Sequence, residues 1–353
     1  MATTMKDVAR RAGVDVSTVS LAINNDPRIR AETRERIVGI AQELGYHKNF
    51  LARGLRSGRS FTIGAAVGGA TAFWSEVLAG AQTVLAQRDY HLLLDFTADS
   101  TQRTAADQIE SLKAKRVDGL LIAPADDLYR LASTGGADAD DAMQAYRSLR
   151  EDNVPFVFVD RFVPGLDADV VSADNVAAGR AAVDYLLGLG HRHIAYMYSP
   201  HRMNTAQMER LQGYQAGMRA AGREPLTWEA VALGADRSEE AKEAMCALLD
   251  DPLGKRITAV LAATDSTALG ALRTLDKAGC DVPQHLSLVG IGGSPLMDYL
   301  RPPVTTVTLP MRELGTEAAN LLLARIEGDT SPLRHRRLPI ALVQRASCGP
   351  IAD

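Results

Sequence analysis

The sequence has few of the features that mark secreted, metal-binding or membrane proteins. It contains three cysteines in 353 residues, Cys246, Cys280 and Cys348, and they form no C-x-x-C pair. Such a set argues against a zinc site and against a disulfide framework. No apolar run approaches the roughly 20 residues that a membrane-spanning helix needs, and the charged N-terminus does not fit a secretory signal. We therefore expect a cytoplasmic protein that needs no metal or cofactor.

The length and the distribution of charge point to several domains with different partners. A chain of 353 residues exceeds what one hydrophobic core usually serves, so two or three domains are expected. The net charge of −4 hides an asymmetry, because residues 1–60 hold eleven basic and six acidic residues and the remainder carries a net −9. The basic end is the candidate for nucleic-acid binding. A small helical domain that uses arginine only for solubility would show the same excess.

Local signals near the N-terminus predict three short helices around one small core. Thr4 and Asp7 have the spacing of a capping box, Gly13 is suited to end the first helix, and Asp15 is suited to cap the second. A third helix is expected over residues 31–44, where apolar residues recur at helical spacing. Two helices joined by a glycine-containing turn form a candidate helix-turn-helix.

The run KDVARRAGVDVSTVSLAIN, residues 6–24, resembles the DNA-binding headpiece of the lactose-repressor/galactose-repressor (LacI/GalR) family. The resemblance implies that the second helix lies in the major groove. It directs three side chains toward base edges, those of Val16, Ser17 and Leu21. Four further residues match positions that hold phosphates, namely Thr4, Ser20, Asn24 and Thr33. Hydroxyl and amide groups suit this role, because they donate hydrogen bonds to phosphate oxygens and set the register on the duplex.

The reading positions depart from the commoner pattern of the family. Asp15 stands where the family usually has serine, and Leu21 stands where many members have arginine. Arginine reads guanine with two hydrogen bonds, whereas leucine and valine pack against apolar edges such as a thymine methyl. The operator half-site is therefore expected to differ from the best-known ones. The alternative is that Val16 and Leu21 are core residues, although Val19, Ala22 and Ile23 already supply an inward face.

Residues 49–58 resemble the hinge helix of the same family, which orders on DNA. Leu55 matches the leucine that enters the minor groove, and Arg53 and Arg56 match backbone contacts. Gly54, and Lys48 where the family often has proline, are expected to leave an isolated hinge largely unfolded, so that its folding is coupled to binding. A plain flexible linker is the alternative.

From residue 61 onward, short apolar strands alternate with amphipathic helices, which predicts parallel sheets covered by helices on both faces. Strands are expected at residues 61–67, 91–96, 119–123, 155–160, 194–198, 259–263 and 286–291. Helices are expected at residues 76–88, 105–115, 177–189, 208–221, 238–249 and 266–278. Seven strands predict two such sheets, and the stretch 126–141 is expected to be a solvated surface loop.

This part of the chain resembles the periplasmic-binding-protein-like core of the LacI/GalR family. The segments that carry the resemblance are VFVDR (157–161), DNVAAG (174–179), LGHRHIA (189–195), RLQGY (210–214), TDSTALGAL (264–272) and PPVTTVTLP (302–310). The implied fold class is α/β, with a small all-α helix-turn-helix headpiece and a core of two Rossmann-like subdomains. The implied domains are a headpiece at 1–46, a hinge at 47–60, and an effector-binding and dimerisation core at 61–345. Within this core, the implied N-subdomain is 61–160 with 292–320, and the implied C-subdomain is 161–291 with 321–345.

The resemblance places an effector-binding site between the subdomains, where parallel strands end. The residues carried over are Phe73, Trp74, Asp160, Arg161, Arg210, Thr264 and Asp265. Aromatic, arginine and hydrogen-bonding groups suit a polar ring or a sugar-like molecule. Each also has a structural alternative: helix capping by Arg210, Thr264 and Asp265, interface packing by the aromatic pair, and mutual pairing of Asp160 with Arg161.

Gly292 stands where sugar-binding members of the family carry an aspartate, and Thr264 stands where many have asparagine. The effector is therefore expected to differ from the familiar hexoses and nucleobases.

These features predict a sequence-specific DNA-binding transcriptional regulator of the LacI type, a repressor in most of the family and not an enzyme. We expect a homodimer that binds palindromic double-stranded operator DNA and a small-molecule effector, with no membrane partner. An α/β enzyme has a similar core, but the sequence shows no nucleophile elbow, phosphate loop or metal set; His191, His193 and His201 lack ligand spacing. A solute-binding protein for transport is the third possibility, but it needs a signal peptide and has no use for residues 1–60.

Overall fold

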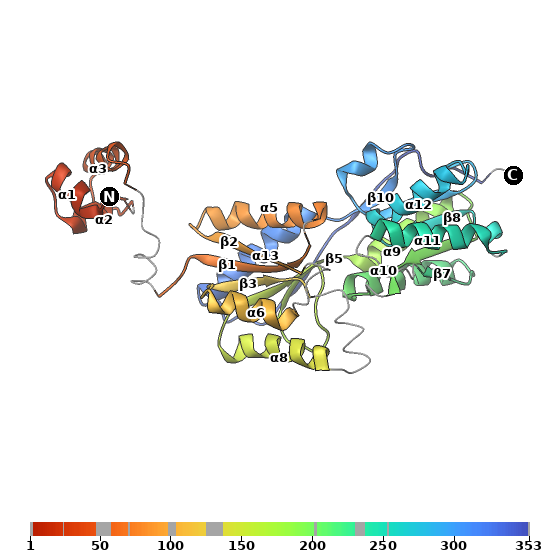
Figure 1. The fold of residues 1–353 in the computed structure, drawn as a ribbon, viewed down its shortest axis with the longest axis horizontal. Helices are drawn as coiled ribbons and strands as arrows, with labels where there is room; N and C mark the ends of the chain where they lie inside the picture. The colour runs from red at the N-terminus through yellow and green to blue at the C-terminus, as the bar shows by residue number, and fades with distance from the viewer. Residues whose placement is uncertain are drawn as a thin grey trace. The chain divides into compact units, whose positions relative to one another are not determined.

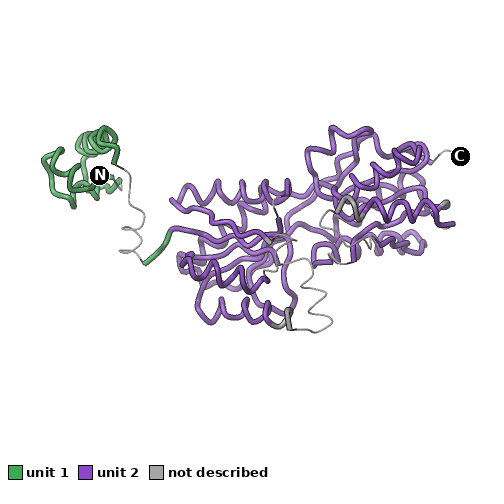
Figure 2. Tube along the Cα trace, viewed as in Figure 1, with its two compact units in different colours: residues 1–60 green, residues 61–353 purple. Residues whose placement is uncertain are grey.

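The computed structural model describes residues 3–23, 25–46, 58–69, 71–97, 104–124, 137–200, 203–229, 237–252 and 254–351. The chain divides into two compact units, residues 1–60 and residues 61–353, each with its own core (Figure 2). No helix in the described ranges is both long enough and apolar enough to cross a bilayer.

The first unit contains three helices, as the sequence predicts: α1 (Met5–Ala12), α2 (Val16–Ile23) and α3 (Ala31–Glu43). Their buried core residues are Val8, Ala9, Ala12, Val19, Ala22, Ile37 and Ala41. Gly13 ends α1 in the left-handed conformation, with a φ of 67° that costs glycine little. Arg34 holds the segment between α2 and α3, because its guanidinium donates to the carbonyls of Asp26 (3.1 Å) and Ile29 (2.9 Å).

The second unit has two lobes, and the N-terminal lobe is built on a six-stranded sheet in which every pairing is parallel. In spatial order its strands are β11 (His335–Leu338), β5 (Asp169–Ala173), β4 (Phe156–Val159), β3 (Gly119–Ile122), β1 (Thr62–Gly68) and β2 (His91–Thr97). Helices α5 (Ala72–Ala86) and α13 (Met311–Ile326) pack on one face, and α6 (Ala105–Ala114) and α8 (Ala137–Glu151) pack on the other (Figure 1). Apolar residues cover both faces, as buried parallel strands require.

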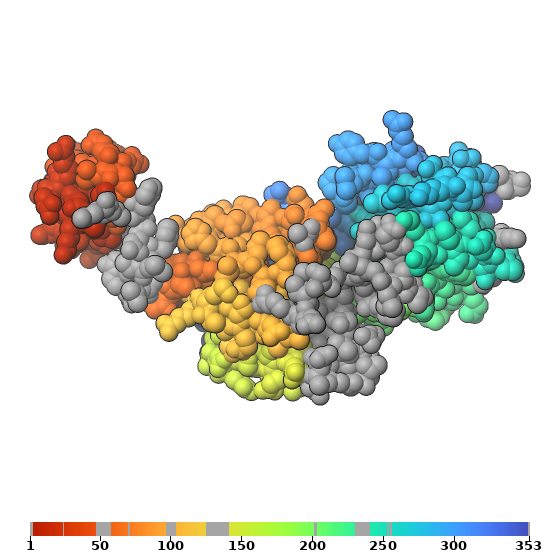
Figure 3. Space-filling model, in the orientation of Figure 1, coloured from red at the N-terminus to blue at the C-terminus, as the bar shows by residue number. Residues whose placement is uncertain are grey.

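The C-terminal lobe repeats this plan. In spatial order its strands are β12 (Ala341–Val343), β10 (Thr305–Thr308), β9 (Ser287–Gly292), β8 (Ala259–Ala262), β6 (Ile194–Tyr198) and β7 (Leu226–Glu229). Only the pairing of β12 with β10 is antiparallel. Helices α9 (Asn175–Gly188) and α10 (Thr205–Ala220) pack on one face, and α11 (Arg237–Asp250) and α12 (Asp265–Lys277) on the other. Two short 3-10 helices, Gly254–Arg256 and Pro295–Asp298, lie in its connections. Figure 3 colours the surface by residue number, so most of the N-terminal lobe is orange to yellow-green and most of the C-terminal lobe is green to blue.

The chain crosses between the lobes three times, after β5, after β10 and after β11. The expected subdomain limits at residues 160, 291 and 320 are therefore wrong in detail. β5 joins the first sheet through β4, and β10 joins the second sheet through β9, so the crossings lie near residues 174, 309–310 and 339–340. Because strands run toward these crossings, the carboxyl edges of the two parallel sheets face each other. We call this region the seam.

Both lobes contain a helix pair in which the backbones nearly touch. A Cβ placed on Gly80 of α5 would lie 2.0 Å from the carbonyl oxygen of Arg312 on α13, and one on Gly315 would lie 1.8 Å from the carbonyl oxygen of Val77. Gly179 and Gly213 make the same close approach between α9 and α10. Glycine is required at these contacts because a methyl group has no room.

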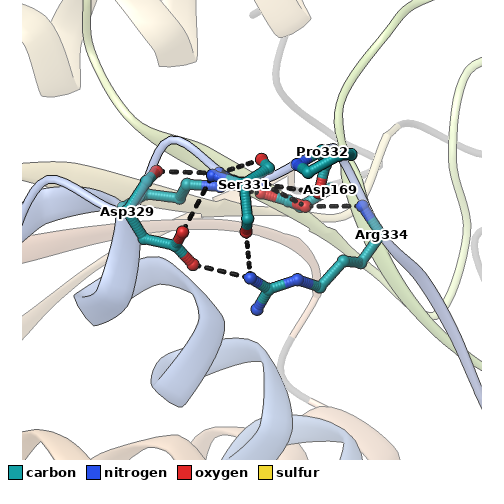
Figure 4. A network of polar contacts seen from close by, with 6 residues as sticks. Asp169, Asp329, Ser331, Pro332 and Arg334 are labelled. Atoms are coloured by element: carbon teal, nitrogen blue, oxygen red, sulfur yellow. Dashed lines mark hydrogen bonds and ion pairs between the residues drawn. The ribbon is translucent and has the colours of Figure 1, made fainter.

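A buried polar network ties the end of α13 to the start of β5. Arg325 donates to both carboxylate oxygens of Asp169 (2.6 and 3.1 Å) and to the carbonyls of Asp329 (2.8 Å), Ser331 (2.7 Å) and Pro332 (3.2 Å). Figure 4 shows Asp169, Asp329, Ser331, Pro332 and Arg334 gathered in this network, and β11 begins at His335, directly after Arg334. The network therefore positions β11 beside β5 at the edge of the sheet.

Several elements differ from the sequence-based expectations. The seven predicted strands are present, but β5, β7, β10, β11 and β12, together with helices α8 and α13, were not predicted. The expected loop over residues 126–141 is wrong at its end, because α8 already begins at Ala137. Residues 125–136 lie outside the described ranges.

Candidate DNA-binding and effector-binding sites

Helix α2 has two different faces. Val19 and Ala22 are buried in the headpiece core, whereas Val16 is 40% exposed and Ser17 is also exposed. Among the described residues, neither Val16 nor half-buried Leu21 belongs to this core or packs against it. The alternative reading of these two residues as core is therefore wrong. Val16, Ser17 and Leu21 share a surface available to another molecule.

The residues expected to bind phosphates differ in whether their side chains already form hydrogen bonds within the headpiece. The hydroxyl and the backbone N–H of Thr4 both donate to the Asp7 carboxylate (2.6 and 3.0 Å), which lowers the pKa of Asp7. The hydroxyl hydrogen of Thr4 must therefore turn outward to reach a phosphate. Within the described part of the headpiece, half-buried Ser20 and Thr33 form no side-chain hydrogen bond, so their hydroxyls are available. Asn24, Arg53, Leu55 and Arg56 lie outside the described residues.

The headpiece also carries exposed cations that the sequence analysis did not single out. Arg10 pairs with Asp7 and Arg28 pairs with Asp26. Counting described residues alone, no acidic partner holds the remaining four, Lys6, Arg11, Arg30 and Arg36. Unpaired surface cations of this kind supply the non-specific attraction to nucleic acid. Only the overall basic charge signalled them in the sequence.

On the N-terminal side of the seam, the structure brings together four of the predicted effector-binding residues. Phe73 and Trp74 lie in the first turn of α5, and Asp160 and Arg161 follow β4. The Arg161 guanidinium carbon is 5.8 Å from the centre of the Trp74 ring, and the Trp74 and Phe73 rings meet edge to face at 5.0 Å. Asp160 has a left-handed φ of 70°, a conformation that is sparsely populated outside glycine and concentrated at functional sites.

Contacts between the lobes surround this group. Phe73 packs against the cores of both lobes. The backbone N–H of Phe162 donates to the Thr205 hydroxyl at 3.0 Å, and Arg337 of β11 donates to Glu209 of α10 at 2.8 Å. Burial raises the pKa of Glu209, and the charge of Arg337 opposes that rise. These contacts hold the two carboxyl edges together.

Arg210 brings a positive charge to the C-terminal side of the seam. Its Nε donates to the Asn175 side chain (2.9 Å) at the start of α9, and its Nη1 donates to the carbonyl of Ala263 (3.0 Å) at the end of β8. The side chain is 5% exposed. These two bonds hold the guanidinium at the carboxyl edge of the second sheet. The alternative of helix capping is not what the contacts show, because Ala263 follows the last residue of strand β8.

Thr264 and Asp265 have structural roles. The hydroxyl of Thr264 accepts from the backbone N–H of Thr267 (3.1 Å) and so caps α12. One Asp265 oxygen accepts from the backbone N–H groups of Gly293 and Ser294, both at 2.7 Å, and the other accepts from the Thr306 hydroxyl at 2.7 Å. Burial raises the pKa of Asp265, and these hydrogen bonds oppose the rise.

A helix-turn-helix unit joined to a two-lobed α/β core defines a DNA-binding regulator with a ligand-binding core. Two family models match: "Bacterial regulatory proteins, lacI family" at residues 4–49 and "Periplasmic binding protein-like domain" at residues 183–348. The Escherichia coli K12 ribose operon repressor is 33% identical over 346 residues, which cover 98% of this chain and 99% of that protein. The chain belongs to the LacI family of transcriptional regulators, and its relatives are regulators rather than enzymes.

Two solved structures show the same architecture along the chain. A Lac repressor dimer bound to operator and the anti-inducer ONPF is 25% identical, with a TM-score of 0.78 over 98% of this chain and 99% of that one. A complex of the transcriptional regulator CelR with cellobiose is 30% identical, with a TM-score of 0.67 over the same shares. Both similarities include the headpiece and the core.

Proposed function

We propose that this protein is a repressor that binds a palindromic operator as a homodimer, and that a small polar molecule bound at the seam changes its operator affinity. The observation that carries the proposal is the surface of α2, on which Val16, Ser17 and Leu21 lie outside the core of a helix-turn-helix unit. A repressor of this kind acts where the DNA is, which places the protein in the cytoplasm.

The composition of the α2 surface determines what it reads. Val16 and Leu21 pack against thymine methyl groups, and Ser17 donates to or accepts from either type of base pair. Thr4, Ser20, Asn24 and Thr33 hold phosphates, and the four exposed cations strengthen that contact. The half-site is therefore recognised through apolar edges and DNA shape more than through guanine.

The hinge residues complete the contact with DNA in this proposal. Leu55 enters the minor groove at a base step, and Arg53 and Arg56 hold the flanking backbone. Leu55→Ala should lower specific operator affinity by roughly tenfold or more and leave non-specific binding nearly unchanged. Equal footprints for the two proteins would contradict this role.

Exposed apolar side chains on the core support association of two copies. Leu296 and Tyr299, which lie in and directly after the 3-10 helix Pro295–Asp298, are 58% and 82% exposed. Large exposed apolar groups mark interaction surfaces when they gather. Tyr299→Asp should shift sedimentation from dimer toward monomer, whereas an unchanged dimer would remove Tyr299 from the interface.

The seam residues Phe73, Trp74, Asp160, Arg161 and Arg210 suit a polar ring with hydroxyl groups. The names of two similar proteins refer to ribose and cellobiose, which supports a sugar-like effector. Thr264 and Asp265 support the site indirectly, because they accept hydrogen bonds from the backbone N–H groups of Thr267 and Gly293.

Selection of bound sequences from random DNA duplexes tests the proposal. Leu21→Arg should change the selected half-site toward guanine, because arginine reads guanine with two hydrogen bonds. Gln42→Arg is the matched control, since it adds the same charge on the exposed side of α3. It should raise overall affinity without changing the selected sequence. Failure to enrich any sequence with the full-length protein would overturn the proposal.

A further inference from the structure

The C-terminal side of the seam holds a buried cation that forms no ion pair with a described residue. Arg210 is 5% exposed, and its bonds go to one amide oxygen and one carbonyl oxygen. No carboxylate of the described residues lies within ion-pairing distance of it. Buried charges are costly unless they are paired, so a guanidinium in this state attracts an anion.

The two carboxylates on which the charge of Arg210 acts, those of Glu209 and Asp265, are engaged by other groups, and so is Asp174, whose charge acts on Glu209. Glu209 accepts from Arg337 at 2.8 Å, and Asp174 caps α9 by accepting from the backbone N–H of Ala177 at 3.0 Å. Both oxygens of Asp265 accept from the protein, at 2.7 Å in all three bonds. Each of these carboxylates is thus already bonded within the protein, and Asp265, which accepts three hydrogen bonds, has the least capacity left for the hydroxyls of a neutral sugar.

Residue 292 supplies no further acceptor, and the structure shows why it is glycine. A Cβ built on Gly292 would lie 2.6 Å from one Asp265 oxygen, and the φ of 159° is one that residues with a side chain rarely adopt. The Asp265 carboxylate therefore fills the space that a side chain at 292 would need. This carboxylate accepts hydrogen bonds from the backbone N–H groups of Gly293 and Ser294 instead of from a ligand.

Two other polar groups of the C-terminal lobe retain hydrogen-bonding capacity. The hydroxyl of Tyr196, which is fully buried, and the hydroxyl of Ser199 have no partner within the described part of the chain. Tyr196 is the central residue of β6, and Ser199 directly follows the last residue of that strand. Buried polar groups normally have partners, and the charge of Arg210 acts on the Tyr196 hydroxyl, so this unpartnered hydroxyl favours an acceptor-rich ligand.

We infer that the effector carries an oxyanion, a carboxylate or a phosphate, which binds Arg210, while its hydroxyl-bearing part faces Asp160, Arg161 and Trp74. This inference rests on the proposed effector site and specifies its ligand class as acidic or phosphorylated sugar derivatives. The planar guanidinium suits such a group, because it can donate two parallel hydrogen bonds to a carboxylate or phosphate.

Thermal unfolding of the full-length protein tests the charge requirement without knowledge of the natural ligand. Inorganic phosphate and D-glucuronate are compared with chloride at equal ionic strength. Either oxyanion should raise the Tm by about 2–4 °C at roughly tenfold excess over its Kd. Arg210→Gln should remove this shift, whereas Arg219→Gln, on the exposed side of the same helix, should retain it. The absence of any shift that depends on Arg210 would overturn the inference.

Calorimetry with matched pairs identifies the source of the oxyanion. D-Glucuronate is compared with D-glucose, and D-ribose 5-phosphate with D-ribose. The acidic member of at least one pair should bind at least tenfold more tightly than its neutral counterpart, and Arg210→Gln should weaken that binding at least tenfold. Arg210→Lys keeps the charge and guards against misfolding of the glutamine variant; it should show an intermediate loss. Neutral sugars that bind as tightly as acidic ones would overturn the inference.

These outcomes separate the inference from the proposed function. A protein that selects an operator and responds to neutral sugars alone refutes the oxyanion and leaves the repressor proposal standing. A protein that selects no operator, but is stabilised by oxyanions through Arg210, refutes the repressor proposal and supports the anion site.

Discussion

Replacing Arg325 with methionine should strongly destabilise the core, because it leaves a carboxylate buried without its counter-charge. The Asp169 side chain is 2% exposed and that of Arg325 is 13% exposed, and they share two hydrogen bonds. After the substitution, Asp169 retains the backbone N–H of Arg334 at 2.8 Å. Breaking a buried pair by removing one partner costs about 3–5 kcal/mol. At roughly 2 °C per kcal/mol for a domain of this size, the Tm should fall by about 6–10 °C.

The assay is urea and thermal unfolding followed by circular dichroism, with Asp169→Asn, Arg325→Met and the double variant compared in one cycle. The double variant should cost clearly less than the sum of the single variants, because it leaves no unpaired buried charge. Arg88→Met is the control, since its ion pair with Glu327 is exposed and should contribute no more than about 1 kcal/mol. Additive losses, or a loss below about 1 kcal/mol for Arg325→Met, would refute the reasoning.

Three further predictions concern packing, pH and the seam. Gly80→Ala should lower the unfolding free energy by about 1–3 kcal/mol or more, because the methyl group would meet the Arg312 carbonyl oxygen; an unchanged urea midpoint would contradict the close helix contact. Burial lowers the pKa of His191 below its ordinary 6.5, so as the pH falls the unfolded chain protonates this imidazole before the folded protein does. The free energy of unfolding should therefore be constant above about pH 7 and decline below about pH 6.5. His191→Gln should reduce this dependence of stability on pH. Asp265→Asn should lower the unfolding free energy by about 1.5–3 kcal/mol, because the two hydrogen bonds from Gly293 and Ser294 lose their charged acceptor. A Tm equal to that of the unchanged protein would show that the turn at Gly293 and Ser294 does not depend on this carboxylate.

The sequence was most informative where local signals agree with the tertiary structure. The headpiece helices follow from capping residues and apolar spacing, and seven core strands follow from short apolar runs. The strands that the prediction missed lack this signal. β11 has the sequence HRRL and is largely exposed, and it becomes a strand only because it pairs with β5, some 165 residues earlier. Local periodicity cannot encode a partner at that distance.

The seam shows the same division at the level of single residues. Phe73, Trp74, Asp160, Arg161 and Arg210 were found by resemblance, and the fold places them at the facing carboxyl edges of two sheets. The burial and the hydrogen-bond partners of these side chains could not be predicted, because both depend on elements that are distant in the sequence. Asp265 is the clearest case, since Gly293, Ser294 and Thr306 engage its carboxylate.

The sequence by itself determined the two-unit organisation, the basic helix-turn-helix and the alternation of strands and helices, because each arises from neighbours a few residues apart. Tertiary structure alone decided where the chain crosses between the lobes and which charges are neutralised. Strand pairing and ion pairing join residues that are far apart in the chain, so the pairing of Asp169 with Arg325 and the unpaired charge of Arg210 appear only after folding.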